Sequence, residues 1–443
     1  MTTMTSSQIP YRTVRWFIPV LSVLLLGYAI AGRGFAYLGA SPLFVGEAAL
    51  ALGLLALLSA GSTRTLLARP LPMILAVFMV WSALSTIPHL TTYRVAALRD
   101  AAFWGYALFA FIVAGLIVRW PDLLREWLVR YRTFALVFTA VAWLAFIIAE
   151  QYGGLFNVPG SGVEFFSAKG GDLLVHMAGA AAFTLIGFSD RPKWVYAFLA
   201  LDVVVIMVSN RGGMVAFAFA MLVLVVVQPP KMRLLPFVYG GVVVMLTLIL
   251  VDPRIQIDDR RTISLDQFKE NLVSVVGNSG TSQLENTKTW RLTWWSDIVE
   301  YTVFGPYFMF GKGYGINLAT DDGFQVNEDE SLRSPHNATM TVLARSGVPG
   351  VALWLLLLVT WYVTLFRNLL HARHRKRYTW VSIHAFLMAY VMAFLVNASF
   401  DVFLEGPMGG IWFWCLMGLG MAVAELYRTQ PDLFIDALEG ASS

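Results

Sequence analysis

The sequence predicts an all-α, polytopic membrane protein with about twelve transmembrane helices and one large loop on a single face. Of the 443 residues, 58% are hydrophobic and 14% are charged, and the mean hydropathy is +0.65, which leaves too little polar surface for a water-soluble fold. Apolar blocks of about 20 residues, the length that crosses a bilayer core, recur along the chain. Residues 251–347 form the long polar interval between them.

The apolar blocks define the predicted spans and three regions of the chain. Nine spans occupy residues 1–250, the loop occupies 251–347, and three spans with a short polar tail occupy 348–443. The blocks fall near residues 16–31, 42–60, 71–88, 100–118, 133–150, 172–188, 194–209, 213–228, 234–250, 348–366, 380–398 and 408–426. Twelve spans place both termini on one side of the membrane.

The distribution of basic residues predicts the orientation. With the N-terminus in the cytoplasm, most Lys and Arg residues fall in cytoplasmic segments, including a dense group at residues 373–377. The short loops on the opposite face contain Arg33, Arg94, Arg99, Lys169 and Arg211. Because cytoplasmic loops are enriched in Lys and Arg, the long loop is predicted to face the outside, which in a bacterium is the periplasmic side of the inner membrane.

The net charge, the cysteine content and the N-terminal sequence limit the possible partners, metal sites and targeting signals. The net charge of +4 is explained by loops near lipid, so we predict no nucleic-acid partner. Cys415 is the one cysteine and lies in an apolar block, which excludes a disulfide or a cysteine metal site. Arg12 and Arg15 before the first block could belong to a secretory signal, but in a many-span protein we expect an uncleaved first helix.

Three patterns stand out within the long loop. Residues 289–303 place Trp290, Trp294, Ile298 and Tyr301 at helical spacing, which predicts a helix at the membrane interface. Glycines at residues 311–315 resemble a phosphate loop only superficially, so a flexible turn is the better interpretation. The acidic cluster at residues 328–330 is interpreted as solvated, because no further ligand is spaced to complete a metal site.

A helix is predicted to start at Ser334-Pro335-His336-Asn337. Serine is a preferred N-cap and proline a preferred first helical residue, so His336 is expected in the first turn. The positive end of the helix dipole would keep the imidazole neutral and able to accept a proton. Residues 347–350, which are Gly-Val-Pro-Gly, are predicted to break this helix before the tenth span.

Ionisable residues near the predicted outer ends of the spans suggest a polar cavity roofed by the loop. They are Glu47, Arg94, Arg99, Asp100, Asp172, His176, Arg211, Asp401 and Glu405. Arg211 is either an interfacial arginine or an anion-binding residue, whose neighbours Gly212 and Gly213 would let a substrate approach the backbone. His176 is either a packed core histidine or part of the substrate site. Asp202 lies near the middle of its predicted span, and we assign it no function.

The order of these features resembles the O-antigen ligase and polymerase family of bacterial envelope glycosyltransferases, with a GT-C-like architecture. The resemblance rests on the span layout, on residues 209–213 before the eighth span and on Trp290-Arg291 with Trp294. It also rests on the 311–315 turn and on Pro335-His336-Asn337 ahead of residues 347–350. Arg345 departs from the acidic or neutral residue expected in many relatives.

The resemblance implies transfer of a glycan from an undecaprenyl pyrophosphate carrier to an acceptor hydroxyl in the periplasm, without metal or nucleotide sugar. The essential histidine of the family falls on His336, and its two arginines fall on Arg211 and Arg291. A guanidinium fork matches phosphate oxygens, which agrees with these roles. An acidic residue after the eleventh span corresponds to Asp401. We predict no cofactor, and the first outer loop, residues 32–41, contains no acid that could bind a metal.

The remaining candidates for substrate contact are Arg94, Arg99, His176, Asn337 and Asp401. Lipid A core or a second lipid-linked glycan could be the acceptor, so ligase and polymerase both remain open, with lipopolysaccharide or another surface polysaccharide as the product. A transporter of lipid-linked glycans is the alternative from another class. Transporters usually show related halves or broken helices near the midplane, and the sequence shows neither.

Overall fold

The computed structural model describes residues 14–61, 68–188, 193–207, 210–230, 232–251, 255–258, 261–263 and 282–434. These residues are mostly helical. The helices before the loop are α2 (Phe17–Ala31), α3 (Arg33–Ala36), α4 (Val45–Ala60), α6 (Pro70–Thr86), η1 (Ile87–His89), α7 (Leu90–Tyr93), α8 (Val95–Gly105), α9 (Leu108–Arg119), α10 (Asp122–Tyr152), η2 (Gly153–Leu155), α11 (Gly170–Leu185), α12 (Lys193–Met207), α13 (Arg211–Val227) and α14 (Leu235–Val251).

The remaining elements belong to the loop and the C-terminal part. The helices are α16 (Ser282–Val303), α17 (Leu318–Asp321), α18 (Ala338–His374), α19 (Tyr378–Ala398) and α20 (Pro407–Thr429). Two small antiparallel pairs complete the described elements: β1 (Gly39–Ala40) with β2 (Leu43–Phe44), and β3 (Ile255–Asp258) with β4 (Arg261–Ile263).

Every predicted apolar block coincides with a helix or a pair of consecutive helices. Among the described residues, six helical stretches are long and apolar enough to cross a membrane: Pro70–Tyr93, Val95–Arg119, Asp122–Leu155, Ala338–His374, Tyr378–Ala398 and Pro407–Thr429. Shorter apolar helices include α2, α4 and α13. The chain is therefore a multi-pass membrane protein, while the number of twelve spans and the side that the loop faces stay predictions.

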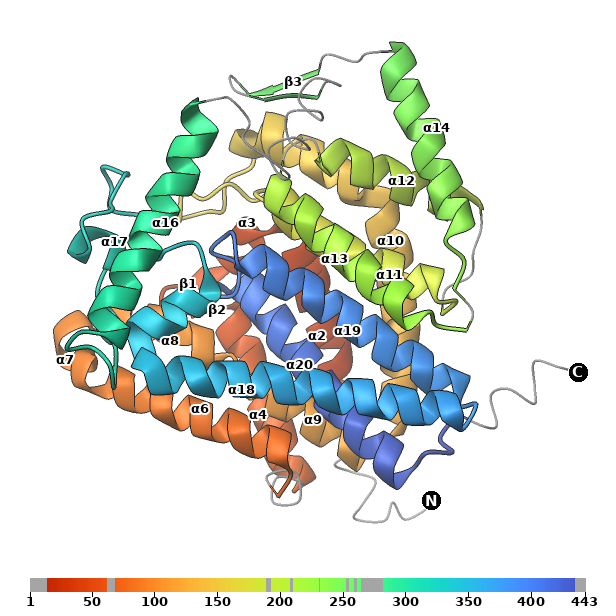
Figure 1. Ribbon diagram of the computed structural model, residues 1–443, viewed down its shortest axis with the longest axis horizontal. Coiled ribbons are helices and arrows are strands. Elements are labelled where there is room, and N and C mark those ends of the chain that lie inside the picture. Colours follow the sequence, from red (N-terminus) through yellow and green to blue (C-terminus); the bar gives the residue numbers. More distant parts are fainter. Residues whose placement is uncertain are drawn as a thin grey trace, which may run out of the picture.

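The helices pack as one bundle around a core rich in aromatic side chains (Figure 1). Helix α13 packs against α11 and α19, and α20 packs against α9. The close approach of α13 to α11 depends on Gly213, since a Cβ there would lie 2.8 Å from Cα of Gly171.

Helix α16 lies across the other end of the bundle, roughly perpendicular to α18 and α19 (Figure 1). The predicted helix at residues 289–303 is confirmed, although it begins earlier, at Ser282. Its Trp294 and Ile298 are fully buried in a second hydrophobic cluster formed with α17 and the start of α18. The apolar face of α16 is therefore used for packing within the loop region, which fixes the position of its polar residues.

Candidate active site

His336 lies just before α18, not in its first turn as the sequence suggested. Asn337 is the N-cap, and its side chain accepts hydrogen bonds from the backbone N–H groups of Thr339 and Met340 at 3.0 and 3.1 Å. The predicted N-cap role of Ser334 is therefore wrong, and the helix-dipole argument for a neutral His336 no longer holds. Asn337, predicted to contact substrate, caps the helix because its side chain oxygen satisfies otherwise unpaired donors.

The backbone at His336 is strained and held by α16. His336 has φ +54°, a left-handed conformation that is uncommon for residues other than glycine. Trp295 Nε1 donates a hydrogen bond to the carbonyl oxygen of Pro335 at 2.9 Å, and the Trp290 and His336 ring centroids are 6.4 Å apart. Such strain persists where the surroundings impose it, often at active sites. Helix α16 therefore sets the direction of the imidazole.

The imidazole faces a carboxylate that is also bound by a lysine. His336 Nδ1 lies 3.4 Å from Asp401 Oδ1, and Lys169 Nζ lies 3.2 Å from both oxygens of Asp401. Burial alone would raise the pKa of Asp401, but His336 and Lys169 outweigh it and hold that pKa below its usual range. Burial likewise disfavours charged Lys169, but Asp401 and Asp172 prevail and raise its pKa. Asp401 is thus an anion held between two basic groups.

Arg211 and Arg291 bring two further cations to this point from separate elements. Arg211 is the first residue of α13, where the Asn210 side chain caps the helix, and Arg291 lies on α16. Burial and the nearby Arg211 lower the pKa of Arg291, although Asp401 opposes them. Arg291 Nε is buried, and no described residue accepts a hydrogen bond from it. Neither guanidinium group makes a hydrogen bond or ion pair with a side chain in the described part of the chain, and two such cations close together form a site suited to an anion.

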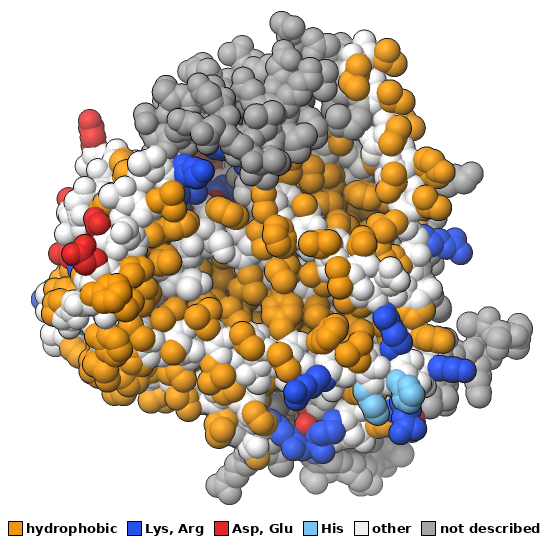
Figure 2. Space-filling model, viewed as in Figure 1, with side chains coloured by type: hydrophobic (Ala, Val, Ile, Leu, Met, Phe, Trp, Pro, Cys, Tyr) orange, Lys and Arg blue, Asp and Glu red, His pale blue; other side chains and the backbone are white. Residues whose placement is uncertain are grey.

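Basic side chains gather in separate places on the visible surface of the molecule. Figure 2 shows a small group of Lys and Arg side chains beside α16, and a second, larger group toward the opposite end of the bundle. Between them the visible surface is dominated by hydrophobic side chains. The visible basic side chains therefore form two separate groups, one of them beside α16.

The other predicted substrate contacts do not join this group. Arg94 and Arg99 are exposed, and neither side chain makes a hydrogen bond or ion pair with the described residues. His176 is buried, its Nδ1 lies 2.8 Å from the Tyr390 hydroxyl, and aromatic rings surround it. The geometry corresponds to a packed core histidine. Gly213 packs against α11, so the expectation that it admits substrate to the backbone is not supported.

Lys169 is the functional candidate that sequence reasoning missed. It was counted only as a basic residue of a short outer loop, and it precedes α11, far in the chain from the loop motifs. Its neighbour Gly171 packs against the side chains of Asn397 and Asn210. The one available signal was a lysine next to the start of a glycine-rich helix, which is too common to single out.

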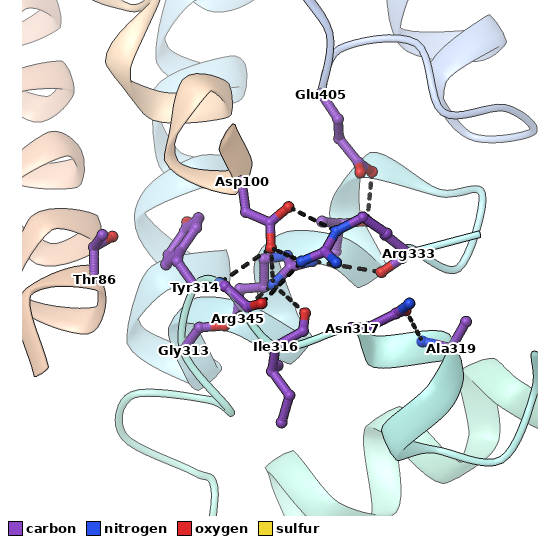
Figure 3. Close-up of polar contacts among 12 residues, drawn as sticks. Thr86, Asp100, Gly313, Tyr314, Ile316, Asn317, Ala319, Arg333, Arg345 and Glu405 are labelled. Carbon is purple, nitrogen blue, oxygen red and sulfur yellow. Dashed lines mark hydrogen bonds and ion pairs between the residues drawn. The ribbon is translucent and has the colours of Figure 1, made fainter. Parts of the chain in front are cut away.

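A buried ion cluster attaches the loop to α8 (Figure 3). Asp100 Oδ2 lies 2.9 Å from Arg333 Nη2 and 3.0 Å from Arg345 Nη1. The same carboxylate accepts a hydrogen bond from Gly315 N at 3.0 Å, within the turn predicted at residues 311–315. Arg345 is 2% exposed and also donates to the carbonyl oxygens of Gly313 and Ile316. Arg345, which departs from the expected family pattern, is therefore explained by a structural role.

Replacing Asp100 with asparagine is expected to destabilise the fold by about 3–5 kcal/mol, because it leaves two buried guanidinium groups without their anion. Unfolding in detergent, followed by circular dichroism, measures the change. Asp329→Asn is the matched control, since Asp329 lies in an exposed part of the loop and should leave the unfolding curve unchanged. Equal curves for Asp100→Asn and the parent protein would contradict the assignment.

The remaining loop motifs are explained by turns, ion pairs and exposure. Among the described residues, no group of three or more His, Cys, Asp or Glu side chains is arranged to hold a metal ion. Lys312, in the glycine-rich turn, pairs with Asp321 and Asp322 at 2.5 Å each. The acidic residues 328–330 are exposed, as expected for a solvated loop. The turn interpretation is confirmed by the positive φ angles of Gly311, Gly313 and Gly315.

Comparison with known proteins identifies the segment that carries most of this site. Residues 195–355 match the family model described as O-antigen ligase. This part of the chain is similar to the O-antigen ligase family. The matched segment contains Arg211, Arg291 and His336, whereas Lys169 and Asp401 lie outside it. The family is one of membrane glycosyltransferases, and the resemblance predicted from the sequence is confirmed. A search of curated proteins finds no match to the chain.

Proposed function

We propose that this protein is an inner-membrane glycosyltransferase that moves a glycan from an undecaprenyl pyrophosphate carrier to an acceptor hydroxyl on the periplasmic side. The observation that carries the proposal is that the guanidinium groups of Arg211 and Arg291 converge near Asp401 and His336 and form no ion pair with the described residues. A diphosphate supplies the anion that these cations lack. The family match supports glycan transfer as the reaction.

In this proposal the two nitrogens of His336 have different tasks. His336 Nδ1 lies 3.4 Å from Asp401 Oδ1, so the proposed mechanism uses the tautomer with its proton on Nδ1, which leaves Nε2 to act as the base. The acceptor hydroxyl gives its proton to Nε2 while its oxygen bonds to the anomeric carbon. Asp401, predicted to contact substrate, would then orient the imidazole and stabilise it after protonation, as an acid does in a hydrolytic triad.

The negative charge of the leaving group explains the presence of Arg211 and Arg291. As the bond between the anomeric carbon and the pyrophosphate oxygen breaks, the electron pair stays on undecaprenyl pyrophosphate. Arg211 and Arg291 neutralise the charge that grows there, and bidentate guanidinium contacts match phosphate oxygens. These cations do the work that a divalent metal does in other glycosyltransferases. Attack from the face opposite the leaving group inverts the anomeric configuration.

Transfer with purified protein tests the proposal. Protein in liposomes receives an undecaprenyl pyrophosphate glycan, EDTA, and either lipid A core or a second lipid-linked glycan. We expect product with one acceptor, with inverted configuration, and the acceptor used distinguishes ligase from polymerase. Absence of product with both acceptors, together with movement of the donor between leaflets, would favour a transporter. Activity that EDTA abolishes and a divalent metal restores would contradict the metal-independent mechanism.

A further inference from the structure

A run of exposed apolar side chains follows α16 and has no part in the proposed chemistry. It occupies residues 304–310, between the end of α16 and the glycine-rich turn. The exposed fractions are 82% for Phe304, 40% for Tyr307, 43% for Phe308, 49% for Met309 and 47% for Phe310. An apolar stretch this dense is costly in water and marks a contact surface.

The backbone of this aromatic segment is fixed against the kink in α18. Val348 N donates a hydrogen bond to the carbonyl oxygen of Phe308 at 2.8 Å, and Lys312 N donates to that of Ala344 at 2.7 Å. The kink occurs at Gly347, where φ is +68° and a Cβ would lie 2.4 Å from the Phe308 oxygen. The backbone therefore faces the protein, which leaves the aromatic side chains facing outward.

The segment lies beside a membrane-spanning helix. The ring of Phe310 stacks on Trp81 of α6, with centroids 4.9 Å apart and planes 9° apart. Trp81 is five residues before Thr86, the last residue of α6, which corresponds to about 7.5 Å along the helix axis. Its neighbours Val80 and Leu84 are exposed, as lipid-facing residues of a span are. The stacked Phe310 therefore lies inside the end of the span.

The apolar surface is continuous between the two elements. In Figure 2, hydrophobic side chains cover the left edge of the molecule below the acidic side chains and extend along α6. Within the bilayer an irregular segment is tolerated when protein partners satisfy its polar backbone groups. The N–H of Phe304 and of Tyr307 bond to α16, and the carbonyl oxygens of Tyr307 and Phe308 accept from Gly311 N and Val348 N. Aromatic residues also favour the boundary between acyl chains and headgroups.

We propose that residues 304–310 insert into the leaflet at the loop end of the bundle and anchor the loop to lipid acyl chains. The anchor holds α16, and with it Arg291, at a constant height relative to the bilayer. A carrier lipid presents its diphosphate at one depth, so this height matters for any reaction at the site. The anchor itself depends only on the packing and exposure of the segment and stands apart from the proposed chemistry.

Spin labels at single cysteines test the insertion. Cys415 is buried and is the one native cysteine, so a full-length Cys415→Ala background accepts Phe308→Cys or Phe304→Cys. Asp329→Cys, in the exposed loop, is the matched control. In liposomes we expect the labels at 304 and 308 to be relaxed more by oxygen than by a water-soluble nickel chelate. The label at 329 should show the opposite preference.

Two outcomes would overturn the proposal. Labels at 304 and 308 that are as accessible to the nickel chelate as the label at 329 would place the segment in water. Labels shielded from both oxygen and nickel would show that a protein surface, not lipid, covers it. Phe304 and Phe308 provide two independent positions, so misfolding of one variant, detected by gel filtration, leaves the other as a test.

Discussion

Replacing His336 with alanine is expected to lower glycan transfer by about 10²- to 10⁴-fold, the usual contribution of a positioned general base. The variant removes the acceptor of the hydroxyl proton but leaves Arg211 and Arg291 in place. Donor binding should therefore remain near that of the parent protein. Single-turnover transfer rates and direct binding of the lipid-linked donor separate the two effects.

His374→Ala is the matched control for this substitution. His374 is exposed near the end of α18 that lies away from the site, so its loss should leave both the rate and donor binding unchanged. If His336→Ala transferred glycan at the parent rate, another group would be the base. The contact between His336 and Asp401 would then be structural.

Substituting Arg291 with methionine is expected to reduce transfer by about 10²- to 10³-fold, as removal of one transition-state donor does elsewhere. Methionine retains the apolar stem but cannot neutralise the departing pyrophosphate. Arg291→Lys should restore only part of the rate, because an ammonium group cannot make the bidentate contact. Steady-state kinetics with varied donor concentration measure both kcat and KM.

A double substitution shows whether the two arginines act on one anion. If Arg211 and Arg291 hold the same diphosphate, the effect of Arg211→Met should be much smaller in the Arg291→Met background than alone. Arg99→Met is the matched control, since Arg99 is exposed and unpaired among the described residues. Additive losses from Arg211 and Arg291, or an equal loss from Arg99, would contradict a shared anion site.

The sequence predicted local features of this site well where lipid or backbone geometry dictates them. The helix at residues 289–303, the turn at 311–315 and the break at Gly347 were each marked by periodicity or by glycine and proline. The start of α18 was misplaced because serine, proline and asparagine are all favoured near helix N-termini. Only the conformation of His336, with its positive φ, shows that the helix begins after Asn337.

The chain by itself determined that this is a multi-pass membrane protein, and its motifs indicated the family. The first property is local, because within a bilayer each span must form its own backbone hydrogen bonds and be largely apolar. The second is also local, because the motifs are short runs of residues. The tertiary structure alone decided which polar residues meet. Lys169 and Asp401 are 232 residues apart in sequence, yet they form one ion pair beside His336. Contacts of that kind depend on how α11, α16 and α19 pack, and the hydropathy pattern of the sequence does not determine that packing.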